Sequence, residues 1–190
     1  MAFQDILKEL GDYPVIAAVR DIEKVDMALL KPVRCIFVLA GDILNIKYPV
    51  THIKKAGKKV FLHLDLLEGI SKNSTGLKYV AREIAPDGII TTKSSLINSA
   101  KNENLFTIQR VFALDSQAVN TAIREIKKVE PNAVEILPGI LPKVIKQFSR
   151  SIPLPLIAGG LIENAEEADN AIKAGAWTVS TSKEYLWDGF

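Results

Sequence analysis

Eight short apolar segments rich in valine and isoleucine recur along this chain of 190 residues, and polar segments with helical spacing separate them. The apolar runs are largely continuous and lack the strict apolar/polar alternation that is typical of strands with one wet face. Continuous apolar strands are expected where helices cover a parallel sheet. The predicted strands are residues 15–19, 35–40, 60–66, 88–92, 106–112, 133–138, 155–160 and 177–182.

The segments between these strands carry helix signals. Asp115 and Asn164 stand where they can cap helices, and Pro142 falls in a first turn, where proline is well tolerated. The predicted helices are residues 22–31, 46–57, 75–85, 94–103, 116–130, 141–150 and 164–174, with a short helical piece at 183–188.

Eight strand–helix repeats predict an α/β fold, a compact TIM-type (β/α)8 barrel in which residues 1–190 form a single domain. The alternative is a doubly wound open sheet. The segment VIAAVRDIEK, residues 15–24, argues against it, because no glycine-rich loop follows the first predicted strand.

The composition is that of an ordinary globular protein, with 48% hydrophobic and 24% charged residues. A formal net charge of +2 neither requires nor excludes nucleic acid as a partner. The single cysteine, Cys35, lies in an apolar run, so we expect a buried thiol and no disulfide, and we predict a cytoplasmic protein. Because no apolar run approaches about 18 residues, we expect no membrane span.

Two neighbouring strand ends carry residues suited to an anion. Gly159 and Gly160 end the seventh predicted strand, and Ser180, Thr181 and Ser182 end the eighth. Glycines allow backbone N–H groups to approach a phosphate closely, and hydroxyl groups supply further donors. Since the loops after the last two strands are the usual phosphate site of such barrels, we predict a phosphate site here.

Charged residues end the other predicted strands and would share the same rim of the barrel. Lys93, Arg110 and Arg20 would neutralise a phosphate. Acceptors for ligand hydroxyl groups are predicted at the remaining strand-end positions, His63, Asp65, Glu68 and Glu135.

Other roles for these residues remain open from the pattern alone. Asp65 and Glu135 could pair with Lys93 and Arg110 as rim ion pairs. His63 is more simply a packed, hydrogen-bonded histidine than a metal ligand, and no metal site is predicted. The alternative function is a phosphosugar enzyme of the aldolase, isomerase or epimerase type. In such an enzyme Lys93 would form a Schiff base with the substrate, or Asp65 and Glu135 would act as a general acid and base.

A set of ordered motifs resembles the glycerol-3-phosphate-responsive antiterminator family, also called glycerol uptake operon antiterminators. The motifs are HLDLLEG at 63–69, DGIITTK at 87–93, TIQRVFALDS at 107–116, VEILPG at 134–139, IAGGLI at 157–162 and AGAWTVSTSKEYLW at 174–187. The resemblance covers nearly the whole chain, and the order and spacing of the motifs make it specific.

This resemblance implies a bacterial regulator and not an enzyme. Such a protein binds glycerol 3-phosphate, needs no cofactor, and then binds leader mRNA so that transcription of glycerol-utilisation genes does not terminate. The candidate RNA contacts are basic residues of two predicted neighbouring helices, Arg124, Lys127, Lys128, Lys143, Lys146 and Arg150. An ordinary solvated helix face would contain the same residues, and a homo-oligomer is left open.

Overall fold

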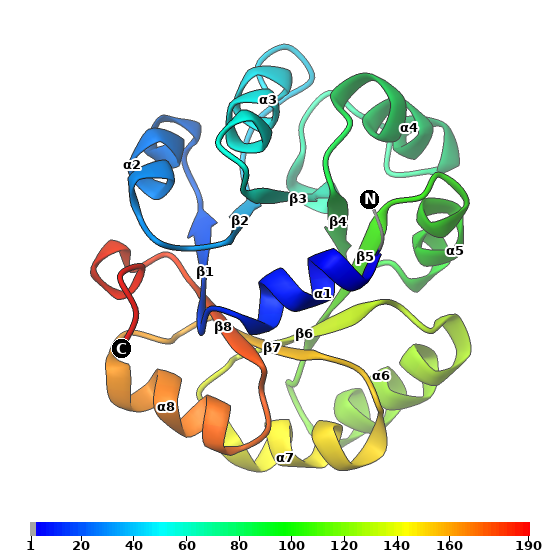
Figure 1. The fold of residues 1–190 in the computed structure, drawn as a ribbon. Helices are drawn as coiled ribbons and strands as arrows, with labels where there is room; N and C mark the ends of the chain where they lie inside the picture. The colour runs from blue at the N-terminus through cyan, green and yellow to red at the C-terminus, as the bar shows by residue number, and fades with distance from the viewer. Residues whose placement is uncertain (1–2) are drawn as a thin grey trace.

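Eight parallel strands close into a barrel in chain order in the computed structural model, which describes residues 3–190 (Figure 1). The last strand pairs with the first, so the predicted (β/α)8 architecture is confirmed and the open sheet is excluded. The strands are β1 Val15–Val19, β2 Cys35–Val38, β3 Lys59–His63, β4 Gly88–Thr91, β5 Phe106–Phe112, β6 Ala133–Leu137, β7 Leu156–Gly159 and β8 Thr178–Thr181.

Helices surround this barrel, and one further helix crosses its end (Figure 1). The α-helices are α1 Phe3–Gly11, α2 Val25–Leu30, α3 Lys47–Lys55, α4 Ser74–Tyr79, α5 Ser94–Asn102, α6 Ser116–Val129, α7 Pro142–Ser151 and α8 Ala165–Lys173. Four short segments have other helical geometry: the 3-10 turns η1 Ile22–Lys24, η2 Leu64–Leu66 and η4 Glu184–Leu186, and the π-helical turn η3 Val80–Ile84.

Most predicted element boundaries shift by one or two residues, but two predicted helices are divided. Residues 22–31 form the turn η1 followed by α2, and residues 75–85 form α4 followed by η3. The second segment ends at Ala85, whose φ of +54° is left-handed and cannot continue a right-handed helix. The caps are as predicted: Asp115 accepts a hydrogen bond from Ala118 N at 2.7 Å, and Asn164 accepts one from Glu167 N at 2.9 Å.

The interior of the barrel is filled with apolar side chains. Phe61 lies between Phe37 and Phe106, with ring centroids 5.5 and 5.7 Å away and both pairs in edge-to-face geometry. Cys35 belongs to this cluster, and burial raises the pKa of its thiol, so the thiol stays protonated. A second and larger apolar cluster lies between the strands and the outer helices.

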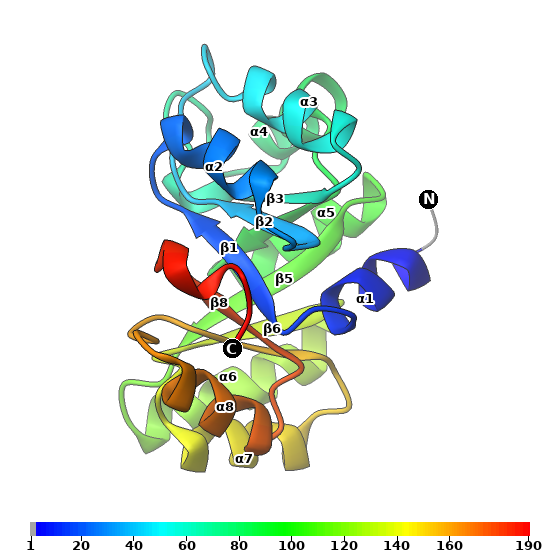
Figure 2. The ribbon, with the colours of Figure 1, turned by 60° about the vertical axis from the view of Figure 1, so that its left-hand side comes forward.

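The N-terminal end of the barrel is closed by α1, for which the sequence analysis predicted no role. Ile6 and Leu10 of this amphipathic helix are buried in the same cluster as the interior of the barrel (Figures 1 and 2). The carboxyl ends of the eight strands meet at the opposite end, and this end remains open for a site. Within residues 3–190, no helix combines the length and the apolar character needed to span a membrane.

Candidate functional site

A cleft of about 560 Å³ lies at the carboxyl ends of the strands, a size typical of small-molecule sites. Its polar lining comes from Arg20, Arg110, Glu135, Gly160, Glu163, Ser180, Thr181, Ser182 and Lys183. Its apolar wall includes Leu39, Leu66, Leu137, Leu161 and Ile162. The cleft therefore brings together the predicted phosphate loops and two of the predicted cations.

The floor of the cleft is a chain of three buried polar side chains. Glu135 Oε2 accepts a hydrogen bond from Arg110 Nε at 2.6 Å, and Glu135 Oε1 accepts one from Ser180 Oγ at 2.6 Å. Glu135 is 1% exposed, and both partners are also buried. Because Nε is only one of five N–H donors of the guanidinium, the other nitrogens of Arg110 remain for a second partner in the cleft.

Gly159 leaves the space that this chain of side chains needs. A Cβ atom at position 159 would lie 2.5 Å from Ser180 Oγ and 2.6 Å from Glu135 Oε1. Gly160 meets a different requirement, because its φ of +74° is a conformation that L side chains rarely adopt. Glycine is therefore required at the two positions for different reasons: at 159 because there is no space for a side chain, and at 160 because the backbone has a positive φ.

The loop after β7 is tied to the chain that follows β8. Thr181 Oγ1 donates to Ile162 O at 2.9 Å, and Lys183 Nζ lies 2.8 Å from Glu163 Oε1. Trp187, which is 1% exposed, donates from Nε1 to Thr181 O at 2.8 Å. These contacts hold the two proposed phosphate loops side by side.

Lys183 and Glu163 line the cleft, although the sequence analysis named neither. Lys183 directly follows the Ser180–Ser182 run. If the predicted site had extended one residue further past the end of β8, it would have included this lysine. Glu163 lies beyond the glycine pair, in a loop that carries no comparable signal.

Asp65 lies outside the cleft lining and bonds to the loop after β4. Its carboxylate accepts hydrogen bonds from Thr91 Oγ1 at 3.0 Å, Thr92 N at 2.7 Å and Thr92 Oγ1 at 2.9 Å. The predicted strand 60–66 ends at His63, and the 3-10 turn η2 carries Asp65 away from the strand direction. Of the two rim ion pairs considered, the structure forms Arg110–Glu135, and no ion pair joins Asp65 to Lys93 among the residues it describes.

Three further predicted residues occupy different positions on the rim. Arg20 is exposed and lines the cleft. Lys93 is exposed outside the cleft lining, where its backbone is the N-cap of α5. Glu68 is exposed in the loop after η2, where its carbonyl oxygen accepts a hydrogen bond from Ile43 N at 3.0 Å.

His63 is buried at the end of β3, 5% exposed, as expected for a packed histidine. The predicted hydrogen bonding of this histidine is not seen at Nδ1, which has no partner among the described residues. Burial lowers the pKa of His63 to about 4, and the nearby charge of Arg110 adds to this effect. The imidazole is therefore neutral near pH 7. Across residues 3–190, no three His, Cys, Asp or Glu side chains are grouped so that they could share a metal ion.

The lowered pKa of His63 predicts a specific acid sensitivity. Between pH 6.5 and about 4 the unfolded chain binds a proton at this residue and the folded chain does not, so stability falls as the pH falls through this range. A pKa difference of this size corresponds to about 3 kcal/mol. Urea unfolding at several pH values should show a flatter profile for His63→Gln than for the unmodified protein. Leu62→Ala, a change at the buried neighbour of His63 in β3 that carries no titrating group, should lower stability by a similar amount at every pH and leave the shape of the profile as it is; an equal flattening by both variants would contradict the assignment.

With the geometry established, the comparisons with known proteins place this chain in a family. The sequence model of one protein family, the glycerol-3-phosphate responsive antiterminators, matches residues 15–187. This range is nearly the whole sequence and includes every strand of the barrel. The chain belongs to the glycerol-3-phosphate responsive antiterminator family.

Solved structures of antiterminators agree with this assignment. The glycerol uptake operon antiterminator regulatory protein of Listeria monocytogenes is 35% identical, with a TM-score of 0.89 over 93% of this chain and 95% of that one. The glycerol uptake operon antiterminator-related protein of Thermotoga maritima is 34% identical, with a TM-score of 0.82 over 92% of this chain and 98% of that one. The family, predicted from the order of motifs, is confirmed.

One further protein is similar in sequence, and another is similar in fold alone. The uncharacterized protein YgcP of Escherichia coli is 40% identical over 182 residues, covering 96% of this chain and 95% of that protein. Deoxyribose phosphate aldolase from Aeropyrum pernix shares 13% identity at a TM-score of 0.70, which shows a common barrel fold and nothing about activity.

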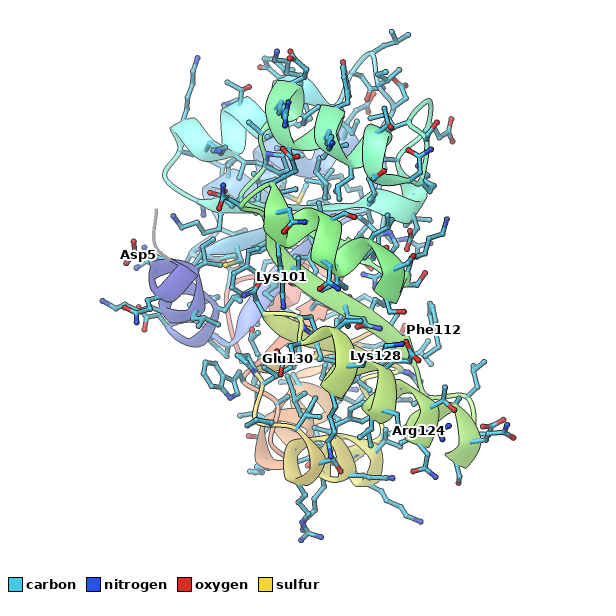
Figure 3. The ribbon with its side chains drawn as sticks, turned by 90° about the vertical axis from the view of Figure 1, so that its right-hand side faces the viewer. Asp5, Lys101, Phe112, Arg124, Lys128 and Glu130 are labelled. Carbon is cyan, nitrogen blue, oxygen red and sulfur yellow. The ribbon has the colours of Figure 1, made fainter. Side chains whose placement is uncertain are left out.

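The basic residues considered for RNA lie on the outer helices α6 and α7 and are not part of the cleft lining. As predicted, α6 and α7 are neighbours, and Gln147 Nε2 donates to Asn120 Oδ1 at 3.4 Å between them. Figure 3 shows Arg124 and Lys128 on the outer side of α6. The exposed basic side chains of this pair of helices are Arg124, Lys127 and Lys128 on α6 and Lys143, Lys146 and Arg150 on α7.

Proposed function

We propose that this antiterminator binds glycerol 3-phosphate in the cleft, and that the ligand-bound form binds leader mRNA and prevents transcription termination of glycerol-utilisation genes. The observation that carries the proposal is the buried Arg110–Glu135–Ser180 chain at the floor of a small-molecule cleft, in a member of this family. The ligand is an anion with two hydroxyl groups. The cleft offers cations and hydrogen-bond donors for the phosphate and carboxylate acceptors for the hydroxyl groups.

In this proposal the phosphate lies against the two loops that follow β7 and β8. Gly160 and the Ser180–Ser182 segment supply close approach and donors, and Arg110 supplies charge. Arg20 and Lys183 add positive charge at the mouth, and no cofactor is required. Glu135 is assigned as an acceptor for the ligand hydroxyl groups. We assign no ligand contact to Asp65, Glu68 or Lys93, which lie outside the lining.

Glycerol 3-phosphate is expected to raise the melting temperature of the protein, because a ligand that binds only the folded state at 100 times its Kd adds about 2.7 kcal/mol of stability. Gly160→Asp should abolish this increase, since it places a carboxylate against the phosphate. Differential scanning fluorimetry with glycerol 3-phosphate, glycerol and inorganic phosphate measures the effect. An unchanged ligand-induced increase in Gly160→Asp would contradict the phosphate assignment.

The RNA part of the proposal is tested separately. A filter-binding assay with the leader transcript of the glycerol-utilisation operon of the same genome should retain RNA in the presence of glycerol 3-phosphate and release it in its absence. Affinity should fall as salt rises, because contacts to RNA phosphates displace counterions. RNA retention that is independent of the ligand would contradict the proposed gating.

The phosphosugar-enzyme alternative receives less support from the geometry. Lys93, the proposed Schiff-base residue, is exposed and lies outside the cleft lining. We therefore propose a regulator without catalysis. Borohydride trapping of a triose or ketose phosphate on Lys93 would favour the enzyme instead.

A further inference from the structure

A second hollow, of about 600 Å³, lies at the carboxyl end of β5, where residues from both faces of the strand, Gln109 to Phe112, contribute to its lining. Side chains along a strand alternate between its two faces. Arg110 thus reaches the buried Glu135 inside the barrel, and Gln109 before it faces the outer helices. The rest of the lining comes from Thr92 and Ser94 at the start of α5 and from residues between Asp115 and Glu125 at the start and in the middle of α6.

Gln109 is an unsatisfied polar group in the wall of this hollow. It is 4% exposed, and its Oε1 atom has no hydrogen-bond partner among the described residues. A buried amide without a partner costs free energy that a ligand can recover. A side-chain amide offers one acceptor and one donor edge, which is the pattern presented by the edges of nucleobases.

The rest of the lining favours a flat, neutral group over a phosphate. Phe112 lies at the end of β5 with its side chain 49% exposed, which leaves a ring face for stacking. Asp115 and Glu125 also line the hollow, and Glu125 Oε2 accepts a hydrogen bond from Ser94 Oγ at 3.1 Å. Carboxylates repel a phosphate and accept hydrogen bonds from the amino groups of bases.

Arg110, whose Nε is bonded to Glu135, is the cationic residue in the lining, and further cationic side chains lie beside the hollow. Figure 3 shows Phe112, Arg124 and Lys128 on the same side of the molecule, with the two basic residues along α6. This arrangement matches a single-stranded nucleic acid, whose backbone follows basic residues and whose base enters a pocket beside an aromatic ring.

We propose that this hollow takes one unpaired base of the bound RNA, stacked on Phe112 with its edge against Gln109. The inference rests on the proposed function and assigns a base-recognising site within it. Arg124 and Lys128 contact the phosphates that flank the base. Because Arg110 and Gln109 are consecutive in β5, the effector cleft and the base site share one strand.

The test compares Phe112→Ala with a matched control, Leu114→Ala, two residues further along and 82% exposed. Filter binding to the leader transcript with saturating glycerol 3-phosphate is measured over a range of salt concentrations. Phe112→Ala should lower RNA affinity about tenfold at every salt concentration, as expected for one lost base stack. The salt dependence should not change, because no phosphate contact is removed. Leu114→Ala should bind as the unmodified protein does.

Chemical probing of the same transcript supplies an independent measurement. One unpaired nucleotide should be protected by the unmodified protein and become reactive again with Phe112→Ala. Gln109→Met, which keeps the side-chain length and removes the amide, should lose the same protection. Melting curves with glycerol 3-phosphate confirm that each variant is folded and binds its effector.

Three results would overturn the base site: unchanged affinity of Phe112→Ala, a weaker salt dependence in that variant, or dissociation of an oligomer by it. The last result would make the patch a contact between copies of the chain. Absence of RNA retention by the unmodified protein is a different outcome, because it removes the proposed function before any variant is compared.

Discussion

Glu135→Leu is expected to lower the free energy of unfolding by about 3–5 kcal/mol, because it leaves the buried charge of Arg110 without its counterion. Arg110 is 8% exposed, so the guanidinium is poorly solvated once the carboxylate is removed. Ser180 Oγ also loses its acceptor. Urea denaturation with linear extrapolation measures the change.

Two further variants separate the buried charge from a general effect of substitution. Asp169→Ala removes an exposed ion pair with Lys173 on α8, and it should change stability by less than about 1 kcal/mol. The double variant Glu135→Leu with Arg110→Met should recover most of the loss, since neither charge then remains buried. If Glu135→Leu alone is as stable as Asp169→Ala, the buried Arg110–Glu135 ion pair does not contribute the predicted stability.

The barrel was predictable because each strand and helix has a local signal. Continuous apolar runs, the caps Asp115 and Asn164 and the position of Pro142 all act within a few residues. The closing helix α1 was not predicted as such. Its amphipathic pattern is visible in the sequence, but its docking depends on the N-terminal ends of strands distant along the chain.

The site was predictable in position and less so in its internal contacts. The strand-end rule gathers Arg110, Glu135 and Ser180 at one rim, but their hydrogen bonds depend on all three pointing inward. Asp65 shows the limit of the rule, since the chain turns into η2 just before it. Leu64 and Leu66 on either side of Asp65 continue the apolar pattern of the strand, so no local pattern predicts the turn.

Gly159→Ala is expected to abolish the stabilisation of the protein by glycerol 3-phosphate through a single methyl group. The added Cβ would lie 2.5 Å from Ser180 Oγ and 2.6 Å from Glu135 Oε1, so the hydrogen bond between these two side chains cannot persist unchanged. Overpacking of this kind costs about 1–3 kcal/mol. The variant should therefore fold with a lower melting temperature, and its response to the effector should be lost.

A glycine elsewhere provides the matched control for this methyl group. Gly11, at the end of α1, has only Trp177 near its Cβ position, at 3.7 Å, and Gly11→Ala should keep the full response to glycerol 3-phosphate. Calorimetric titration of both variants distinguishes a weakened fold from a damaged site, because only the second removes binding at a temperature where the protein is folded. If Gly159→Ala bound glycerol 3-phosphate as tightly as Gly11→Ala, Ser180 and Glu135 would lie outside the effector site, and the phosphate would have to be held by the outer cations Arg20 and Lys183.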